Sequence, residues 1–382
     1  MKTLAVALIA LLLGACASAP PPMAPAAPLF HDELVEAPTV RIDADAALAL
    51  TPAMRAYLAT RLVPRPLAVD RRRELVNALY RGELKLEYDA DFTRTASEAF
   101  DARSGNCLAL VLMTAAFAKE LHLTVHYQSI VGDEAWDRAG ELYIGIGHVN
   151  LLLEDNTPQG SMRFAQRPMV IDFLPARNAE RLETREIDER TLVAMYLNNR
   201  AVESLARGQT SNAYWFAREA LRTDPGLLSA YVSLGVVYRA LHQPALAEAA
   251  LRRVAERDPD NVYALSNRIL ALRDLGRGAE ADALAQRLAR IDPHPPFSYF
   301  HEGMAAYRER RYEAARRLFA KEVARAPYHH EFEYWLAVSY LQLNDLERAG
   351  VHLKRAMDVS TTRKDHDLYA TKLDRLKALT AQ

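Results

Sequence analysis

Apolar residues follow different periods in the two halves of the chain, and these periods predict its architecture. Thr51 and Pro52 open a short helix, because Thr suits the N-cap and Pro suits the first helical position. Apolar positions at helical spacing predict an amphipathic helix over about 68–81, and residues 95–100 begin another short helical turn. We therefore expect short helices before residue 106.

The most apolar helix is predicted from Asn106 to about Leu121. Only Thr114, Lys119 and Glu120 interrupt its apolar positions. A helix that is hydrophobic on nearly every side belongs in the interior of a domain. This helix is therefore expected to be the central element of the N-terminal part.

Segments after this helix are predicted to be strands. Residues 123–130 alternate apolar and polar side chains, residues 132–140 are expected to be a loop, and residues 141–154 and 168–175 form two further strands. Helices followed by strands predict an α+β domain over residues 31–190, in which the buried helix packs on a small antiparallel sheet.

The chain after Thr191 is predicted to be helical and repetitive. Proline recurs every 34 residues, at Pro225, Pro259, Pro293 and Pro327. Two further series keep this period: Ala201, Gly235, Ile269, Gly303 and Ala337, and Ala213, Ala247, Ala281, Ala315 and Ala349. Most members of these series are small, as expected where two helices cross closely.

This period resembles the tetratricopeptide repeat (TPR), in which each unit of 34 residues forms two helices. Tyr231-x-x-Leu234-Gly235-x-x-Tyr238 is similar to the signature of the first helix, and Ala315-x-x-x-Phe319 to that of the second. The resemblance implies an all-α TPR solenoid of about five repeats over residues 191–363 and a capping helix over residues 364–382.

Composition and charge limit the classes of function. The chain has 382 residues, of which 50% are hydrophobic and 25% are charged, as in a globular protein large enough for two domains. Lys and Arg number 48 and Asp and Glu number 49, so the formal net charge is −1. A general nucleic-acid-binding protein carries a basic excess, and we therefore expect no nucleic-acid partner.

The N-terminal segment has the features of a targeting signal. Lys2 supplies a positive charge, and the ten apolar residues from Leu4 to Leu13 are too few to span a bilayer. Residues 1–15 are therefore predicted to be a signal peptide. A plain signal peptide that is cut near Ala19 is one possibility.

The other possibility follows from Leu13-Gly14-Ala15-Cys16, which resembles the lipobox of bacterial lipoproteins. The resemblance implies that Cys16 carries a diacylglyceryl group and an N-linked acyl chain, such as palmitate. Ala17 follows, and lipoproteins similar to this one, without Asp there, usually go to the outer membrane. The protein is thus expected in the cell envelope, facing the periplasm, with residues 16–30 as a Pro- and Ala-rich tether.

Cys107 is the candidate nucleophile. It begins the apolar helix, and it is the remaining thiol of the mature chain if Cys16 is acylated. A helix N-terminus favours negative charge and so favours a thiolate. Gly105 lets the backbone approach closely, and the amide of Cys107 is expected to point into an oxyanion hole.

His148 and Asp172 are the candidate base and orienting carboxylate. His148 lies on the second predicted strand after Gly145-Ile146-Gly147, where missing side chains open space. Asp172 lies on the third predicted strand, and it can orient His148 if the two strands are neighbours. A cysteine on a helix followed by histidine and aspartate on strands is the order found in papain-like and transglutaminase-like enzymes.

Residues of about 70–175 resemble a bacterial transglutaminase-like core domain. The motifs that carry this resemblance are ARSGNCLA at 102–109, GHVNL at 147–151 and VIDF at 170–173. The resemblance implies that Cys107 is the nucleophile, His148 the general base and acid, and Asp172 the orienting carboxylate of acyl transfer through a thioester. The chain lacks the aromatic residue that many members carry just after the histidine.

Two hypotheses for function follow. In the first, an envelope lipoprotein with a cysteine acyl-transfer or amide-hydrolysing site acts on a protein or peptide, and its repeats recruit a partner. In the alternative, the chain is a non-catalytic adaptor, Cys107 is an inert core residue and the degenerate domain serves binding. Gly145-Ile146-Gly147 lacks the third glycine of a dinucleotide site, and the histidines at 294, 301, 329 and 330 lack ligand spacing, so no cofactor or metal is expected.

Overall fold

The computed structural model describes residues 25–61, 70–80, 84, 86–89, 92–130, 135–139, 142–146, 148–154, 168–173, 183–294, 297–327, 329–360 and 363–380. The predicted signal segment and Cys16 lie outside these residues, as does Gly147. Among the helices described, none is both long enough and apolar enough to cross a membrane.

Short helices precede the sheet: α2 (Pro52–Arg61), α3 (Arg71–Tyr80), α4 (Ala96–Ala102) and α5 (Cys107–Glu120). Thr51 is confirmed as a cap of α2, because its hydroxyl accepts a hydrogen bond of 3.2 Å from the amide of Met54. A capping box opens α4, in which the Thr95 hydroxyl and the Glu98 carboxylate each accept from the other residue's amide.

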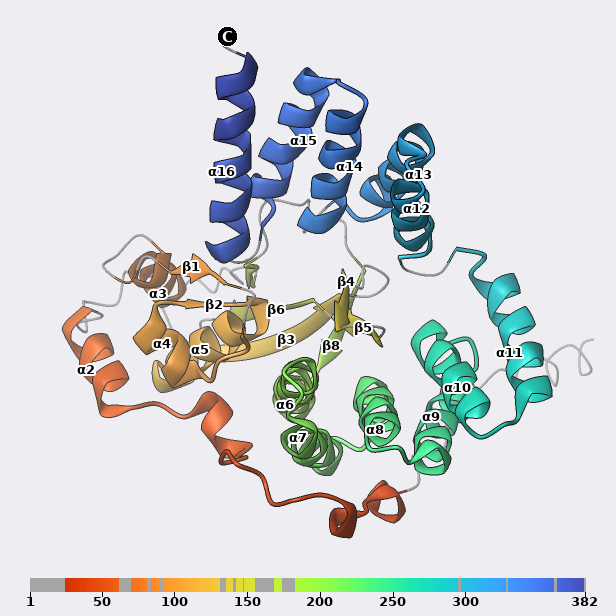
Figure 1. Ribbon diagram of the computed structural model, residues 1–382. Coiled ribbons are helices and arrows are strands. Elements are labelled where there is room, and N and C mark those ends of the chain that lie inside the picture. The colour runs from red at the N-terminus through yellow and green to blue at the C-terminus, as the bar shows by residue number, and fades with distance from the viewer. Residues whose placement is uncertain are drawn as a thin grey trace, which may run out of the picture.

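Helix α5 is the centre of the N-terminal part. All its residues from Cys107 to Ala118 are buried, which confirms the expectation from its apolar sequence. The helix packs against β3 (Thr124–Ile130) and β6 (Val149–Glu154) of the sheet. Figure 1 shows α4 and α5 lying against these strands.

The main sheet is antiparallel, with the strand order β7-β6-β3-β8. Strand β7 spans Met169–Ile171 and β8 spans Thr184–Ile187. The predicted small antiparallel sheet therefore exists. The pairing of β6 with β7, from Leu151↔Ile171 to Leu153↔Met169, brings the ends of these strands together as the sequence suggested.

The strand predicted over 141–154 is two strands in different sheets. β5 (Leu142–Ile146) pairs with β4 (Ala135–Ala139) in a separate hairpin, whereas β6 belongs to the main sheet. The loop predicted over 132–140 was wrong where it contains β4. Alternating apolar and polar residues distinguish the buried face of a strand from its exposed face. They do not show with which other strand it pairs.

Strands β1 (Glu87–Tyr88), β2 (Ser104–Gly105) and β8 were not predicted. The first two are only two residues long and pair in parallel, with Tyr88 opposite Gly105. The residues of β8 are mostly exposed, so this strand lacks an apolar face that the sequence could reveal. Short and exposed strands leave little periodic signal.

Helices occupy the C-terminal part: α6 (Glu189–Ala206), α7 (Thr210–Thr223), α8 (Leu228–Ala240), α9 (Pro244–Arg257), α10 (Val262–Asp274), α11 (Gly278–Ile291), α12 (Ser298–Arg308), α13 (Tyr312–Arg325), α14 (His330–Gln342), α15 (Leu346–Asp358) and α16 (Arg363–Thr380). Helices α7, α9, α11 and α13 each end two residues before one of the 34-spaced prolines. Proline disfavours a helical residue before it, and Asp224 is accordingly extended.

Small residues let the two helices of a repeat cross closely. A Cβ atom built on Gly235 would lie 2.6 Å from Cγ of Leu251, and one on Gly303 would lie 2.7 Å from Cε1 of Phe319. Both distances are far inside normal contact, so a side chain at either glycine requires the neighbour to move. The structure thus gives the physical reason for this 34-residue series.

A left-handed residue follows the first helix of each pair. The residues with positive φ at this place are Gly208, His242, Gly276, Arg310 and Asn344, again 34 positions apart. The next amide donates to a carbonyl five residues earlier, as from Gln243 to Tyr238, and this bond closes the helix end. The sequence analysis did not find this series, because only two members are glycine.

A strap formed by residues 25–50 runs along the outside of the first repeats, as the red segment in Figure 1 shows. It contains short 3-10 helices at Ala27–Leu29, Asp32–Leu34 and Asp45–Leu48, and Ala26 and Leu29 are buried. The Tyr214 hydroxyl donates to Asp32 at 2.7 Å, and Trp215 donates to the carbonyl of Glu36 at 2.7 Å. Residues 25–30 of the predicted tether are therefore packed rather than free.

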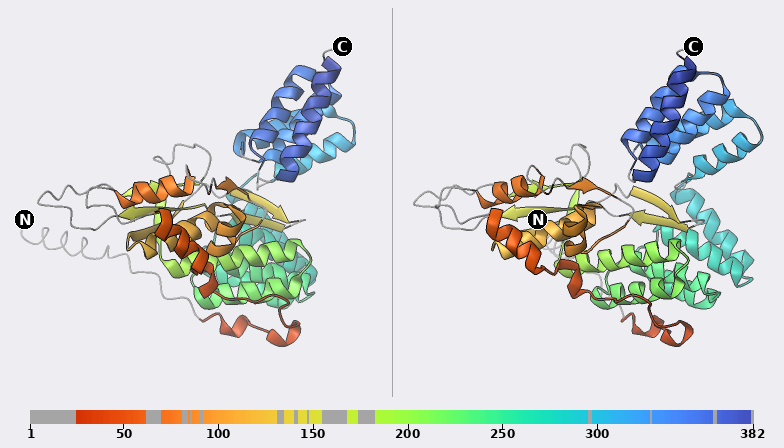
Figure 2. Two further views of the ribbon diagram at one scale, coloured as in Figure 1. Left: turned by 90° about the vertical axis from the view of Figure 1, so that its left-hand side faces the viewer. Right: turned by 60° about the vertical axis from the view of Figure 1, so that its left-hand side comes forward.

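Three separate apolar clusters of described residues support the C-terminal helices, the smallest of them between α10 and α11. Buried residues of the strap, the sheet and the helices from α6 to α10 belong to one cluster. Residues from Phe297 to Leu376 form another, which holds α12 to α16 together. Figure 2 shows α12 to α16 as a block that stands away from the sheet. The repeat array therefore consists of parts that are stabilised by different cores.

Candidate functional site

Cys107 is the first residue of α5, and its position is fixed from both sides. The Asn106 side chain caps the helix by accepting a hydrogen bond of 2.9 Å from the amide of Ala109. A Cβ atom at Gly105 would lie 2.8 Å from Cβ of Ala109, so glycine is required for this close approach. The thiol thus stands at the positive end of a helix dipole, as the sequence indicated.

His148 and Asp172 meet at the edge of the sheet. His148 directly precedes β6 and Asp172 directly follows β7. Nε2 of His148 lies 2.8 Å from Oδ1 of Asp172, and the Cys107 side chain lies close enough to the imidazole to raise its pKa. The structure therefore brings together the three residues that the sequence singled out.

The surroundings of His148 favour its protonated form. Burial lowers the pKa of this imidazole, but hydrogen bonds to Asp172 and Cys107, together with their charges, raise it to about 9. An imidazolium that lies beside a thiol can donate its proton to a leaving group.

The three side chains have little access to solvent. Cys107 is 7% exposed and His148 is 5% exposed. Neither residue lines either of the two clefts described below.

The larger cleft, of about 720 Å³, lies between the first repeats and the sheet. Its walls come from α6, α8 and β8, and it includes Asn198, Val232, Val236, Arg185 and Glu186. A smaller cleft beside the C-terminal end of α5 includes Arg55, Lys119 and His122.

Asn198 contributes a buried amide oxygen to the larger cleft. Its side chain is 5% exposed, and Oδ1 has no hydrogen-bond partner among the described residues. A buried amide oxygen without a partner is costly and is satisfied when a ligand supplies a donor. The cleft therefore combines an apolar floor with a buried acceptor.

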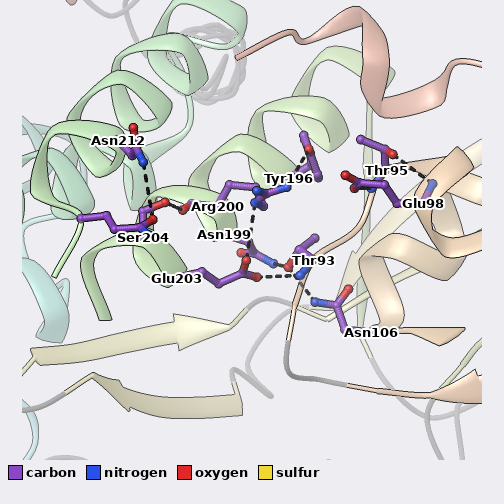
Figure 3. A network of polar contacts seen from close by, with 11 residues as sticks. Thr93, Thr95, Glu98, Asn106, Tyr196, Asn199, Arg200, Glu203, Ser204 and Asn212 are labelled. Atoms are coloured by element: carbon purple, nitrogen blue, oxygen red, sulfur yellow. Dashed lines mark hydrogen bonds and ion pairs between the residues drawn. The ribbon is translucent and has the colours of Figure 1, made fainter. Parts of the chain in front are cut away.

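A polar network joins the repeats to the N-cap of α5 (Figure 3). The Thr93 hydroxyl accepts hydrogen bonds from Asn106 at 2.7 Å and from Asn199 of α6 at 3.3 Å. The amide of Thr93 donates to the Glu203 carboxylate at 2.7 Å. Helix α6 is therefore connected on one face to the residue before Cys107, while its other face lines the larger cleft.

Two histidines of the C-terminal part contact aromatic residues. His329 stacks on Phe332 with ring centres 4.2 Å apart, and His330 is hydrogen-bonded to Tyr369 at 2.7 Å. Within the ranges that the structure describes, no group of three or more His, Cys, Asp or Glu side chains could hold a metal ion.

Comparison with known proteins identifies the C-terminal part. The family model of the tetratricopeptide repeat matches residues 232–296 and 300–357. No curated protein matches the chain.

Solved structures match the same part. YrrB, described as a TPR protein with an unusual peptide-binding site, is 23% identical over 47% of this chain and 92% of its own, with a TM-score of 0.26. A thermophilic TPR protein of Thermus thermophilus is 18% identical over 47% of this chain and 98% of its own, with a TM-score of 0.31. MamA of Desulfovibrio magneticus is 17% identical over 45% and 96%, with a TM-score of 0.26. The C-terminal part of the chain contains tetratricopeptide repeats.

Proposed function

We propose that the chain is a partner-binding protein whose repeats hold an extended peptide segment of another protein. The observation that carries this proposal is the cleft of about 720 Å³ between the first repeats and β8. The match to the tetratricopeptide repeat supports a role in protein–protein interaction. It agrees with the adaptor hypothesis and does not require catalysis.

The chemistry of the cleft suits a peptide. Val232 and Val236 supply apolar surface, and the Oδ1 atom of Asn198 can accept a hydrogen bond from a peptide amide. Arg185, Glu186 and Ile187 of β8, the outermost strand of the sheet order, form the opposite wall. An extended segment thus meets apolar, charged and hydrogen-bonding groups together.

Peptide selection tests this proposal. Peptides from a random display library are selected on the full chain and then measured against the Asn198→Leu and Val232→Arg variants. The proposal predicts one consensus whose affinity falls at least tenfold in Val232→Arg, because a charge would enter the apolar floor. Leu343→Arg, at an exposed residue outside the cleft, is the matched control. Equal affinity for all variants contradicts this site.

As a second candidate, we propose that the N-terminal part is a transglutaminase-like domain with a cysteine acyl-transfer or amide-hydrolysing site. The observation that favours it is the pair His148–Asp172 at 2.8 Å beside Cys107. One residue from a helix and two from adjacent strand ends form a nucleophile, a base and an orienting carboxylate.

The reaction would proceed in two steps. The Cys107 thiolate attacks an amide carbonyl carbon, a C–S bond forms, and the π electrons of the carbonyl move onto oxygen. When this species collapses, the C–N bond breaks and the amine leaves with the proton of the His148 imidazolium. Water or a second amine then attacks the thioester and gives a proton to His148, and the thiolate leaves.

Alkylation tests the second candidate. The folded full chain is treated with iodoacetamide, and the peptide that contains Cys107 is followed by mass spectrometry. We expect labelling without denaturant and slower labelling in His148→Ala, because the imidazolium that stabilises the thiolate is removed. Labelling only after unfolding would contradict the thiol site and leave the partner-binding proposal standing.

The lipid anchor at Cys16 and the location in the cell envelope remain proposals, since Cys16 lies outside the described residues. They are supported by the lipobox-like sequence LGAC at 13–16. Metabolic labelling with radioactive palmitate should modify the wild-type chain and not Cys16→Ser. Equal labelling of Cys107→Ala and the wild type would show that the label does not report on Cys107.

A further inference from the structure

The parallel pair β1–β2 places an aromatic hydroxyl beside the proposed nucleophile. Tyr88 of β1 lies opposite Gly105 of β2, two residues before Cys107. Hydrogen bonds of 3.0 Å on either side, from Glu87 to Arg103 and from Asp89 to Gly105, fix this register. The position of Tyr88 is therefore set by backbone bonds to the segment that leads into α5.

The side chain of Tyr88 reaches the start of the helix. It is half-buried and packs against the core of the N-terminal part. Its hydroxyl lies close to Cys107, because the backbone amide of that residue acts on the pKa of the hydroxyl. Burial raises the pKa of this hydroxyl above its ordinary value, and the nearby charge of Cys107 raises it further, so the proton stays on oxygen.

We propose that Tyr88 is a catalytic residue that donates a hydrogen bond to the oxyanion formed when Cys107 attacks a carbonyl group. This inference rests on the second candidate function, the cysteine acyl-transfer site. It supplies the side-chain donor that the sequence motifs did not reveal.

The position of Tyr88 suits this task. Its protonated hydroxyl, held beside Cys107 by the β1–β2 pairing, can donate to the oxygen of a carbonyl group that the thiol attacks. A fixed donor in a buried site stabilises the developing negative charge without reorganisation of water. The helix dipole of α5 acts in the same direction.

The test compares two reactions of the same thiol in the full chain. p-Nitrophenyl acetate acylates Cys107 through an oxyanion, whereas iodoacetamide alkylates it by direct substitution without one. For Tyr88→Phe we expect acylation to fall by about 100-fold, the effect of losing one oxyanion donor, and alkylation to stay unchanged. Tyr57→Phe is the matched control, because the Tyr57 hydroxyl donates to the carbonyl of Ala78 away from Cys107.

The outcomes separate this inference from the function on which it rests. Acylation at the wild-type rate in Tyr88→Phe overturns the role of Tyr88 and leaves the cysteine site intact. A fall of both reactions in Tyr88→Phe assigns Tyr88 to the packing of the thiol and also overturns the inference. A wild-type chain that is alkylated but never acylated contradicts the acyl-transfer site itself. Circular dichroism of each variant verifies that the fold is retained.

Discussion

The carboxylate of Glu203, on the first repeat helix α6, accepts a hydrogen bond of 2.7 Å from the backbone amide of Thr93, which lies before α4. Glu203 is half-buried, and this burial raises its pKa, while the hydrogen bond and nearby arginines act in the opposite direction. The Thr93 hydroxyl in turn accepts from Asn106 and Asn199. The N-terminal part and the repeats are thus joined by polar contacts as well as by apolar packing.

Removal of the Thr93 hydroxyl should weaken this connection. In Thr93→Val the side-chain amides of Asn106 and Asn199 lose their common acceptor, and a buried donor without a partner costs about 1–3 kcal/mol. We expect the free energy of unfolding to fall by that amount in urea denaturation. Alkylation of Cys107 should also change, because Asn106 caps its helix. Thr93→Ser keeps the hydroxyl and should behave like the wild type; equal loss in both variants would contradict the role of the hydroxyl.

Asp172→Asn should lower the pKa of His148 from about 9 toward its ordinary value of 6.5, because the carboxylate that favours the imidazolium is lost. A histidine whose pKa is raised in the folded chain adds stability that is complete below pH 6.5 and lost as the pH rises through 9. The difference in unfolding free energy between wild type and variant should therefore shrink over that pH range. NMR titration of the His148 ring measures the shift directly.

The control for this titration lies elsewhere on the sheet. The half-buried His126 is hydrogen-bonded at 3.0 Å to Glu186, which is exposed. Glu186→Gln removes a carboxylate from a histidine without touching Asp172. It should leave the His148 titration unchanged, and a shift equal to that of Asp172→Asn would mean that the change is not local.

The sequence predicted the features that depend on local pattern. Helix α5 was predictable because apolar residues occupy nearly all of its faces. The repeats were predictable because small residues and proline recur every 34 positions. The three residues Cys107, His148 and Asp172 were identified from their places at the helix start and on neighbouring strands. Their assembly required the pairing of β6 with β7 and the packing of α5 against β6.

Features that depend on contacts between residues far apart in the sequence were not predictable. Tyr88 stands next to Cys107 only because the two-residue strands β1 and β2 pair in parallel, and such short strands have no period. Residues 25–30, where the strap begins, looked like the end of a tether because proline and alanine dominate that stretch of the sequence. Its packing depends on Tyr214 and Trp215 of the repeats, far away in sequence.

Gly235→Ala should destabilise the repeats, because the added Cβ atom would lie 2.6 Å from Cγ of Leu251. Overpacking of this kind costs about 1–3 kcal/mol, and it should lower the midpoint of thermal unfolding. Gly278→Ala is the matched control, since nothing lies within 4 Å of its added Cβ. The control should be neutral or slightly stabilising, because alanine favours helix α11. If Gly235→Ala also proved neutral, Leu251 must be able to move aside.

His242→Gly should stabilise the chain, because residue 242 has a φ of 57° in the turn between α8 and α9. A side chain in this left-handed region is strained, and glycine is not, so a gain of about 0.5–1 kcal/mol is expected in the free energy of unfolding. The equivalent Gly208 and Gly276 already have glycine there, with φ of 72° and 73°. Gly208→Ala, where nothing lies within 4 Å of the added Cβ, tests the reverse change and should cost a similar amount through the backbone alone. If the two substitutions change the free energy of unfolding with opposite signs, backbone conformation determines which residues suit this 34-residue turn series. A loss of stability in His242→Gly would show instead that the histidine makes contacts that outweigh the strain.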